Sequence, residues 1–161
     1  MKLRSWQAEA FPLWWDKQQG IIKVVTGGGK TFFAIHCIKE YIKAFPEKDI
    51  LIVVPSIALL DQWNEALLEN NINQEIVLNG GGEKVDKSAK IIVTTIDSLK
   101  NILGIVNAEN SLLIVDECHK IGTEKRGDML NNNWSATLGL SATPESCLLY
   151  TSPSPRDLYR S

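Results

Sequence analysis

Three consecutive glycines precede a lysine and a threonine in VVTGGGKTFFAIHCI, residues 24–38. Glycine costs roughly 0.5–1 kcal/mol relative to alanine inside regular structure, so three in a row between an apolar run and a helical pattern require a reason. In a P-loop, backbone N–H groups hold phosphate, a lysine reaches the terminal phosphates, and the next hydroxyl holds magnesium at the start of a helix. Each of these parts is supplied by Thr26, Gly27, Gly28, Gly29, Lys30 and Thr31.

The glycine segment departs from the strict P-loop consensus at one position. The consensus G-x-x-x-x-G-K-[ST] begins with glycine, and this chain has Val24 there. An ordinary strand-to-helix turn therefore stays open as the alternative to a nucleotide site.

The second group with catalytic potential is the acidic pair Asp116-Glu117, which follows the apolar run 112–115. A parallel strand that ends here places Asp116 at its carboxyl end, where ligands of open α/β sheets bind. Asp116 is then positioned to hold magnesium, and Glu117 to orient and deprotonate a water molecule. Taken alone, the pair is also consistent with a strand that runs into a solvated loop.

Short apolar runs rich in valine and isoleucine alternate with helical patterns along the chain. The runs, each typical of a strand buried on both faces, are residues 21–25, 50–54, 91–95, 112–115 and 137–140. The helical patterns are residues 5–17, 31–45, 57–68 and 97–103. This alternation predicts an α/β fold with a mostly parallel sheet flanked by helices. Residues 79–87 are predicted to form an exposed loop.

Composition narrows the class of protein. The 161 residues are 44% hydrophobic and 22% charged, which is near the globular average and sufficient for one domain with its own core. The net charge of −2 gives no overall attraction to nucleic acid, although local patches stay possible. Three cysteines without CxxC spacing and two histidines argue against a disulfide framework and a zinc site. No run of about 18 apolar residues occurs, so we expect a cytoplasmic protein without a membrane partner.

Six segments in order resemble the motifs of superfamily 2 helicases and translocases, in particular the group that includes type III restriction enzyme helicase subunits and related phage helicases. They are LRSWQAEA at 3–10, TGGGKT at 26–31, VPS at 54–56, VTT at 93–95, DECH at 116–119 and SAT at 141–143. In this superfamily the glycine missing at Val24 is not required. The resemblance covers residues 3–144 and implies a RecA-like P-loop NTPase domain that uses ATP and Mg²⁺ in a bacterial or phage-infected cell.

The resemblance also implies a role for each motif. Gln7 contacts the adenine base, and residues 26–31 bind the phosphates. Thr31 and Asp116 hold magnesium, while Lys30 and Glu117 act with Asp116 in catalysis. His119 couples DECH to SAT, through Ser141 or Thr143. Nucleic acid, DNA rather than RNA, is contacted through short hydroxyls and backbone groups by Pro55, Ser56, Thr94 and Thr95.

Two further side chains have competing interpretations. Trp63, at helical spacing within residues 57–68, favours a core position over a platform on which bases stack. Cys118 favours inert packing beside the site over a reactive thiol.

The sequence changes character after Pro144. Residues 147–157, CLLYTSPSPRD, have no helical or strand period, and they are encoded by a DNA string that resembles a transposase adapter used for sequencing libraries. We therefore expect residues 1–146 to form the helicase ATP-binding domain and residues 147–161 to be a non-native tail without regular structure. A flexible linker rich in serine and proline is the alternative.

The implied function is ATP hydrolysis coupled to movement on, or unwinding of, nucleic acid. The resemblance implies two RecA-like domains with ATP between them, the second carrying an arginine that stabilises the transition state. Nothing after the SAT motif supplies that arginine, so the chain by itself is expected to bind nucleotide weakly. Two alternatives stay open, namely a nucleotide-binding module that regulates a partner without hydrolysis, and the motor subunit of a restriction nuclease.

Overall fold

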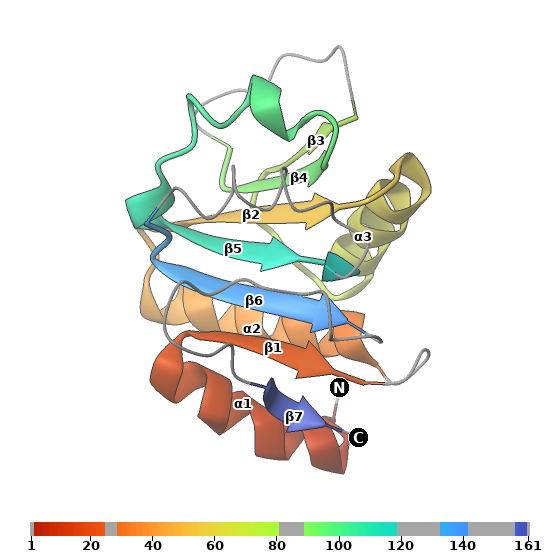
Figure 1. Ribbon diagram of the computed structural model, residues 1–161, viewed down its shortest axis with the longest axis vertical. Helices are drawn as coiled ribbons and strands as arrows, with labels where there is room; N and C mark the ends of the chain where they lie inside the picture. The colour runs from red at the N-terminus through yellow and green to blue at the C-terminus, as the bar shows by residue number, and fades with distance from the viewer. Residues whose placement is uncertain (1, 25–28, 81–88, 119–132, 142–156, 161) are drawn as a thin grey trace.

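The computed structural model describes residues 2–24, 29–80, 89–118, 133–141 and 157–160. Within these residues, seven strands form one sheet, and every neighbouring pair is parallel (Figure 1). The parallel α/β sheet predicted from the sequence is confirmed. In order across the sheet the strands are β3 (Ile76–Asn79), β4 (Ile91–Thr95), β2 (Asp49–Val54), β5 (Ser111–Val115), β6 (Ala136–Ser141), β1 (Gln19–Lys23) and β7 (Asp157–Arg160).

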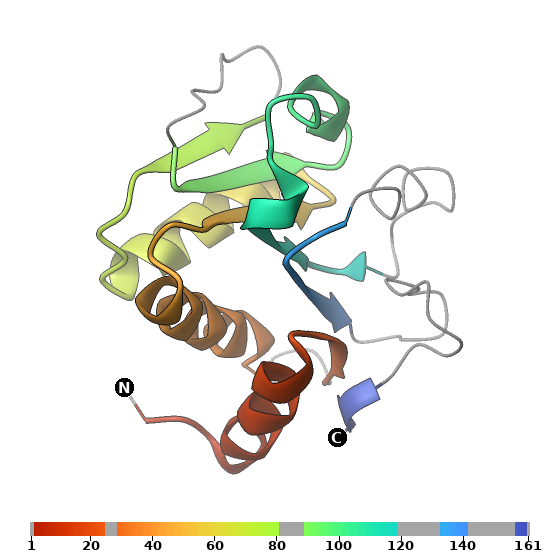
Figure 2. The ribbon, with the colours of Figure 1, turned by 90° about the vertical axis from the view of Figure 1, so that its left-hand side faces the viewer.

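The helices α1 (Ser5–Lys17), α2 (Lys30–Ala44) and α3 (Ile57–Glu69) pack on one face of this sheet (Figure 2). Strand β2 shows how the apolar runs serve both faces. Ile50 and Ile52 pack toward the helices, whereas Leu51 and Val53 pack toward the opposite face. Successive side chains of a strand point to opposite sides, so a strand covered on both faces is apolar throughout.

The predicted boundaries of the main elements lie within about two residues of the observed ones, and the prediction for residues 91–95 coincides with β4. The short helix predicted at 97–103 is only a three-residue 3₁₀ turn, η1 (Leu99–Asn101). A second turn of this kind, η2 (Ala108–Asn110), was not predicted. Such turns are stabilised by contacts with the sheet more than by a pattern of their own.

Strand β3 corrects the expectation of an exposed loop from residue 79. Asn79 ends this strand and is buried, and its amide donates to Thr94 Oγ1 at 3.0 Å and to the Ser98 carbonyl at 3.1 Å. Polar residues next to glycine are typical of loops, but here Asn79 satisfies buried polar groups of the neighbouring strand.

Strand β7 lies within residues 147–161, for which the sequence predicts no regular structure. The backbone of Asp157–Arg160 pairs with β1, and the register shifts between Ile21 and Ile22. An edge strand offers unpaired N–H and C=O groups that pair with any extended segment, whatever its side chains. The pairing therefore does not bear on the origin of the tail, and residues 147–156 and 161 lie outside the described residues.

Helix α1 is anchored to the sheet through a buried tryptophan. The Trp14 indole N–H donates to the Thr137 carbonyl of β6 at 2.8 Å, and the ring is fully buried. Pro12 lies within the helix without ending it. Residues of α1 also contact β1 and β7, so the helix covers these two strands on one face of the sheet.

The two cysteines within the described residues are both buried. Cys37 is a free thiol in α2. Cys118 packs with the apolar cluster on the face of the sheet opposite the helices, which agrees with the packing interpretation from the sequence.

Candidate nucleotide-binding site

Three chain segments with polar residues leave the sheet at the same edge. Strand β1 leads to the glycine loop, β5 leads to Asp116, and β2 leads to Pro55 and Ser56 (Figure 1). Because these strands are parallel members of one sheet, their carboxyl ends lie together. At the carboxyl ends of the strands, Gly29 and Lys30 therefore lie near Asp116 and Glu117.

Helix α2 begins at this edge with an N-terminus suited to an anion. Its N-cap, Gly29, has a left-handed backbone (φ 87°), and no side chain caps the helix. A Cβ atom added at Gly29 would lie 2.8 Å from Gln7 Nε2, the end of a side chain that could shift, so the left-handed conformation rather than the space favours glycine. The first-turn N–H groups of a helix lack backbone partners inside it and carry partial positive charge, which favours phosphate.

The lysine that follows is paired with the second carboxylate of the acidic pair. Lys30 Nζ donates a hydrogen bond to Glu117 Oε1, and both side chains are largely buried. Glu117 has a left-handed backbone (φ 50°), which costs of order 1–3 kcal/mol for a residue other than glycine. The turn that follows β5 therefore holds the carboxylate toward α2 at a conformational cost.

Asp116 is almost fully buried, and neutral donors orient it. The Trp63 indole N–H donates to Oδ2 at 2.8 Å, and the Glu117 backbone N–H donates to Oδ1 at 2.9 Å. Burial raises the pKa of Asp116, while the Trp63 hydrogen bond and the Lys30 charge act in the opposite direction. A carboxylate held this way is oriented without being neutralised, as a metal ligand requires.

Gln7 ties the start of α1 to the end of the glycine loop. Its Nε2 donates to the Gly29 carbonyl at 2.9 Å, and its Oε1 accepts from the Arg4 backbone N–H at 2.7 Å. The side chain is buried beside the predicted phosphate site. Its contact with adenine stays a prediction, because both ends of the amide bond to protein groups here.

The predicted nucleic-acid residues fall into two groups. Pro55 and Ser56 lie at the carboxyl end of β2 with Ser56 exposed, and Ser56 Oγ accepts from the Leu59 backbone N–H at 3.3 Å to cap α3. Thr94 and Thr95 are only 0% and 5% exposed. The Thr94 hydroxyl donates to the Thr95 carbonyl at 2.9 Å, so it is engaged within the protein, and contact of these two threonines with nucleic acid stays a prediction.

The other predicted site residues are only partly described. Thr31 lies in the first turn of α2, and Ser141 is buried at the end of β6, where its carbonyl accepts from Val24 N–H at 3.2 Å. This bond places the SAT segment beside the entry to the glycine loop. Outside the described residues lie Thr26, Gly27, Gly28, His119 and Thr143.

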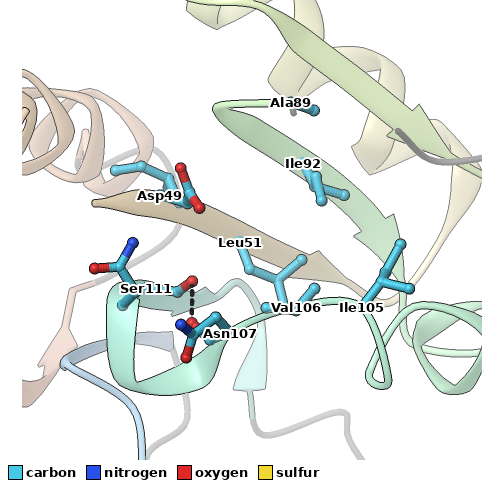
Figure 3. A pocket seen from close by; sticks show the side chains of 10 residues that line it. Asp49, Leu51, Ala89, Ile92, Ile105, Val106, Asn107 and Ser111 are labelled. Atoms are coloured by element: carbon cyan, nitrogen blue, oxygen red, sulfur yellow. Dashed lines mark hydrogen bonds between the residues drawn. The ribbon is translucent and has the colours of Figure 1, made fainter. Parts of the chain in front are cut away.

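Two cavities lie at different ends of the sheet. One of about 410 Å³ opens between α2 and α3 and is lined in part by Gly29, Lys30 and Thr31. Another of about 170 Å³ lies where β2 and β5 begin (Figure 3). Asp49 is the titratable residue that lines this second cavity, and burial raises its pKa while Lys90 lowers it. An acidic cavity at the amino ends of the strands does not suit a phosphate. The first cavity borders the start of α2, but neither Asp116 nor Glu117 lines it, so it adjoins the candidate site without containing the acidic pair.

Sequence reasoning missed the contact that Trp63 makes with Asp116. Its burial in the core confirms the interpretation from helical spacing. No pattern in the sequence predicts this hydrogen bond, because its two residues are 53 positions apart in the chain. The packing of α3 on the sheet brings them together.

The sequence of this chain is similar to that of known proteins. Residues 1–146 match the family model described as type III restriction enzyme, res subunit. The chain is 36% identical over 146 residues to the DNA 3'-5' translocase XPB2 of Sulfurisphaera tokodaii, covering 90% of this chain and 31% of that protein.

Solved structures show the same fold. The Sulfolobus solfataricus SWI2/SNF2 ATPase core in complex with dsDNA matches with a TM-score of 0.75 and 18% identity, over 89% of this chain and 32% of that one. The UvsW helicase of bacteriophage T4 matches with a TM-score of 0.70 and 20% identity, over 89% and 53%. Within the described residues, no helix is long and apolar enough to cross a membrane.

Proposed function

The chain belongs to the type III restriction enzyme res subunit family, and from that premise we propose that it is the ATP-binding half of an ATP-driven motor that moves on or unwinds DNA. One observation carries the proposal, namely the meeting of Lys30, Asp116 and Glu117 at the start of α2. Lys30 and Glu117 are 87 positions apart, and an ordinary strand-to-helix turn gives no reason for this convergence.

The residues of the site fit a magnesium nucleotide. The uncapped start of α2 and the Lys30 ammonium group would bind phosphate oxygens, and Thr31 and Asp116 would supply oxygen ligands for the metal. Magnesium, when bound, would supply positive charge that stabilises the negative charge developing on the phosphates. Glu117 would orient a water molecule and accept its proton.

The Lys30–Glu117 hydrogen bond suggests an order of events, in which phosphate binds to Lys30 before Glu117 binds water. While Lys30 bonds to Glu117, the donor that it uses is not available to phosphate and the accepting carboxylate oxygen is not available to water. The entry of a phosphate group would draw Lys30 away, which would release Glu117 to hold water.

We propose that DNA is the nucleic acid on which the motor moves. The relatives named above include a DNA translocase and an ATPase core solved with dsDNA. In this chain Pro55 and Ser56 lie at the carboxyl end of β2, the end of the sheet that carries the candidate nucleotide site. Pro55 is partly exposed and Ser56 is exposed. Contacts by a hydroxyl and backbone groups suit sequence-independent binding of phosphates, which a chain with a net charge of −2 could still make.

The activity of the whole protein needs more than this chain. The chain spans about a third of the translocase that it matches. We place the completing arginine and a second RecA-like domain outside these residues. The presence of Lys30, Asp116 and Glu117 argues against a regulatory module without hydrolysis, whereas the motor subunit of a restriction nuclease stays a specific form of the same proposal because of the family description.

Two measurements test the proposal. Titration of the chain with a fluorescent ATP analogue should show weak saturable binding that Mg²⁺ strengthens. The intact gene product should hydrolyse ATP faster when double-stranded DNA is added. Nucleotide binding without any effect of DNA on hydrolysis would contradict the motor, and absence of nucleotide binding to either protein would contradict the site.

A further inference from the structure

Trp63 makes a contact that core packing alone does not explain. Its ring is 1% exposed and belongs to the apolar cluster between the helices and the sheet. The N–H of the ring nevertheless points to a carboxylate, Asp116 Oδ2, at 2.8 Å. An indole has one donor and no acceptor, so this bond uses the entire polar capacity of the side chain.

The two carboxylates of the acidic pair, Asp116 and Glu117, differ in the charge of the groups that donate hydrogen bonds to them. Glu117 bonds to a cation, Lys30, which offsets its charge. The hydrogen bonds to Asp116 come from the neutral Trp63 ring and a backbone N–H. A neutral donor fixes the direction of a carboxylate and leaves its negative charge for a metal, whereas an ammonium group in that place would compete with the metal.

We propose that Trp63 is a positioning residue for magnesium: by holding Oδ2, its indole N–H keeps the Asp116 carboxylate in the orientation that receives the metal of a bound nucleotide. This inference rests on the proposed nucleotide site. Partners that orient a metal ligand typically change metal affinity or activity by roughly 10–100-fold when removed. Trp63 therefore acts on Mg²⁺ through Asp116 and makes no contact with the nucleotide.

The chain offers a matched control. Trp14 is equally buried and also donates its indole N–H at 2.8 Å, but its acceptor is the backbone carbonyl of Thr137. Trp63→Phe and Trp14→Phe each remove one buried indole donor and leave an aromatic ring. A difference between them therefore reports on the acceptor rather than on the loss of packing.

The dissociation constant of ADP is measured for the 161-residue chain and both variants, in EDTA and in excess Mg²⁺. Trp63→Phe should lose about 10-fold or more of the strengthening by Mg²⁺ and stay within about 2-fold in EDTA. Trp14→Phe should keep the strengthening. In ¹⁵N spectra, the indole N–H signal absent from Trp63→Phe should shift when Mg²⁺ is added to the ADP-bound parent, and the Trp14 signal should not.

Each outcome has one meaning. Equal strengthening by Mg²⁺ in Trp63→Phe and the parent overturns the positioning role and leaves the nucleotide site intact. Equal weakening with and without Mg²⁺ also overturns it, since a structural role alone predicts that result. No strengthening in the parent contradicts the proposed function and removes this inference with it. If Trp63→Phe fails to fold, replacing Trp63 with 3-benzothienylalanine, which has sulfur in place of N–H, gives the same comparison.

Discussion

The ammonium group of Lys30 bonds to the carboxylate of Glu117, which joins the first turn of α2 to the turn that follows β5. The two groups that we propose for phosphate binding and for proton transfer thus satisfy each other in this structure. The pair keeps a buried cation and a buried carboxylate from standing alone, which would be costly. Binding of phosphate must replace one partner of this bond, and the first two predictions follow from that exchange.

Lys30→Ala should weaken binding of MgATP by roughly 10–100-fold, because hydrogen bonds to charged groups contribute about 1.5–3 kcal/mol. Binding of adenosine should change little, since its base and sugar carry no phosphate for the lysine to contact. Lys90→Ala is a suitable control, because Lys90 bonds to the Pro46 carbonyl, which follows the end of α2 opposite to Lys30. Titration with both ligands measures the effect, and an equal loss for ATP and adenosine would mean that Lys30 has a structural role.

Glu117→Gln in the intact protein should lower ATP hydrolysis by about 10²–10⁴-fold, the usual contribution of a general base. Affinity for ATP should stay within a few-fold or become slightly tighter, because the amide competes less well than a carboxylate for Lys30. Steady-state hydrolysis with DNA, together with direct titration of ATP, separates the two effects. The exposed Glu109, changed to Gln, should keep parental rates. Parental hydrolysis by Glu117→Gln itself would exclude Glu117 as the base.

Asp116→Asn should stabilise the folded chain at neutral pH while weakening the Mg²⁺ dependence of nucleotide binding. Burial raises the pKa of Asp116 in the folded state. The folded state then holds the proton more tightly than the unfolded chain does, so the stability from this carboxyl is present at low pH and is lost as pH rises through the folded-state pKa. The asparagine variant has no such loss.

The difference in melting temperature between Asp116→Asn and the parent should accordingly grow as pH rises through that pKa and vanish below the ordinary carboxyl value near about 4. Thermal unfolding of both chains across pH measures it. A variant that is less stable than the parent at pH 7 would show that the carboxylate, despite its burial, stabilises the fold.

Gln7→Glu should destabilise the chain by about 1–3 kcal/mol, because the Gly29 carbonyl would lose its donor and face a buried negative charge. The oxygen that accepts from Arg4 is kept, so the change tests the donor alone. Gln19→Glu, at an exposed position of β1, should have little effect on denaturant unfolding. If both atoms of the Gln7 amide also contact the base, Gln7→Glu should weaken binding of ATP through loss of the donor, and an unchanged affinity for ATP would exclude that contact.

Removal of residues 147–161 should change the free energy of unfolding by less than about 0.5 kcal/mol, the range of most surface changes. The strand β7 adds four residues to one edge of the sheet, and short edge strands open easily. Denaturant unfolding of chains ending at residues 146 and 161 measures the difference. A loss of several kcal/mol would mean that these residues belong to the domain.

The sequence by itself determined the strands of the core and the type of site. A strand covered on both faces must be apolar along its whole length, which is a local property, and the apolar runs accordingly predicted β2, β4 and β5 closely. The glycine segment and the acidic pair were also readable, because each of them carries its chemistry within a few adjacent residues. Their position at one edge followed from parallel strands.

Only the tertiary structure decided which polar groups meet. Trp63 reaches Asp116 because α3 packs over β2 and β4, next to the strand that precedes the acidic pair, and helical spacing gives no indication of which acceptor a buried indole finds. Thr94 lies inside because Asn79 of a strand too short to predict covers it. Hydrogen bonds between segments far apart in the chain depend on packing geometry at the scale of an atom, whereas a pattern of apolar residues records only which face of each element is buried.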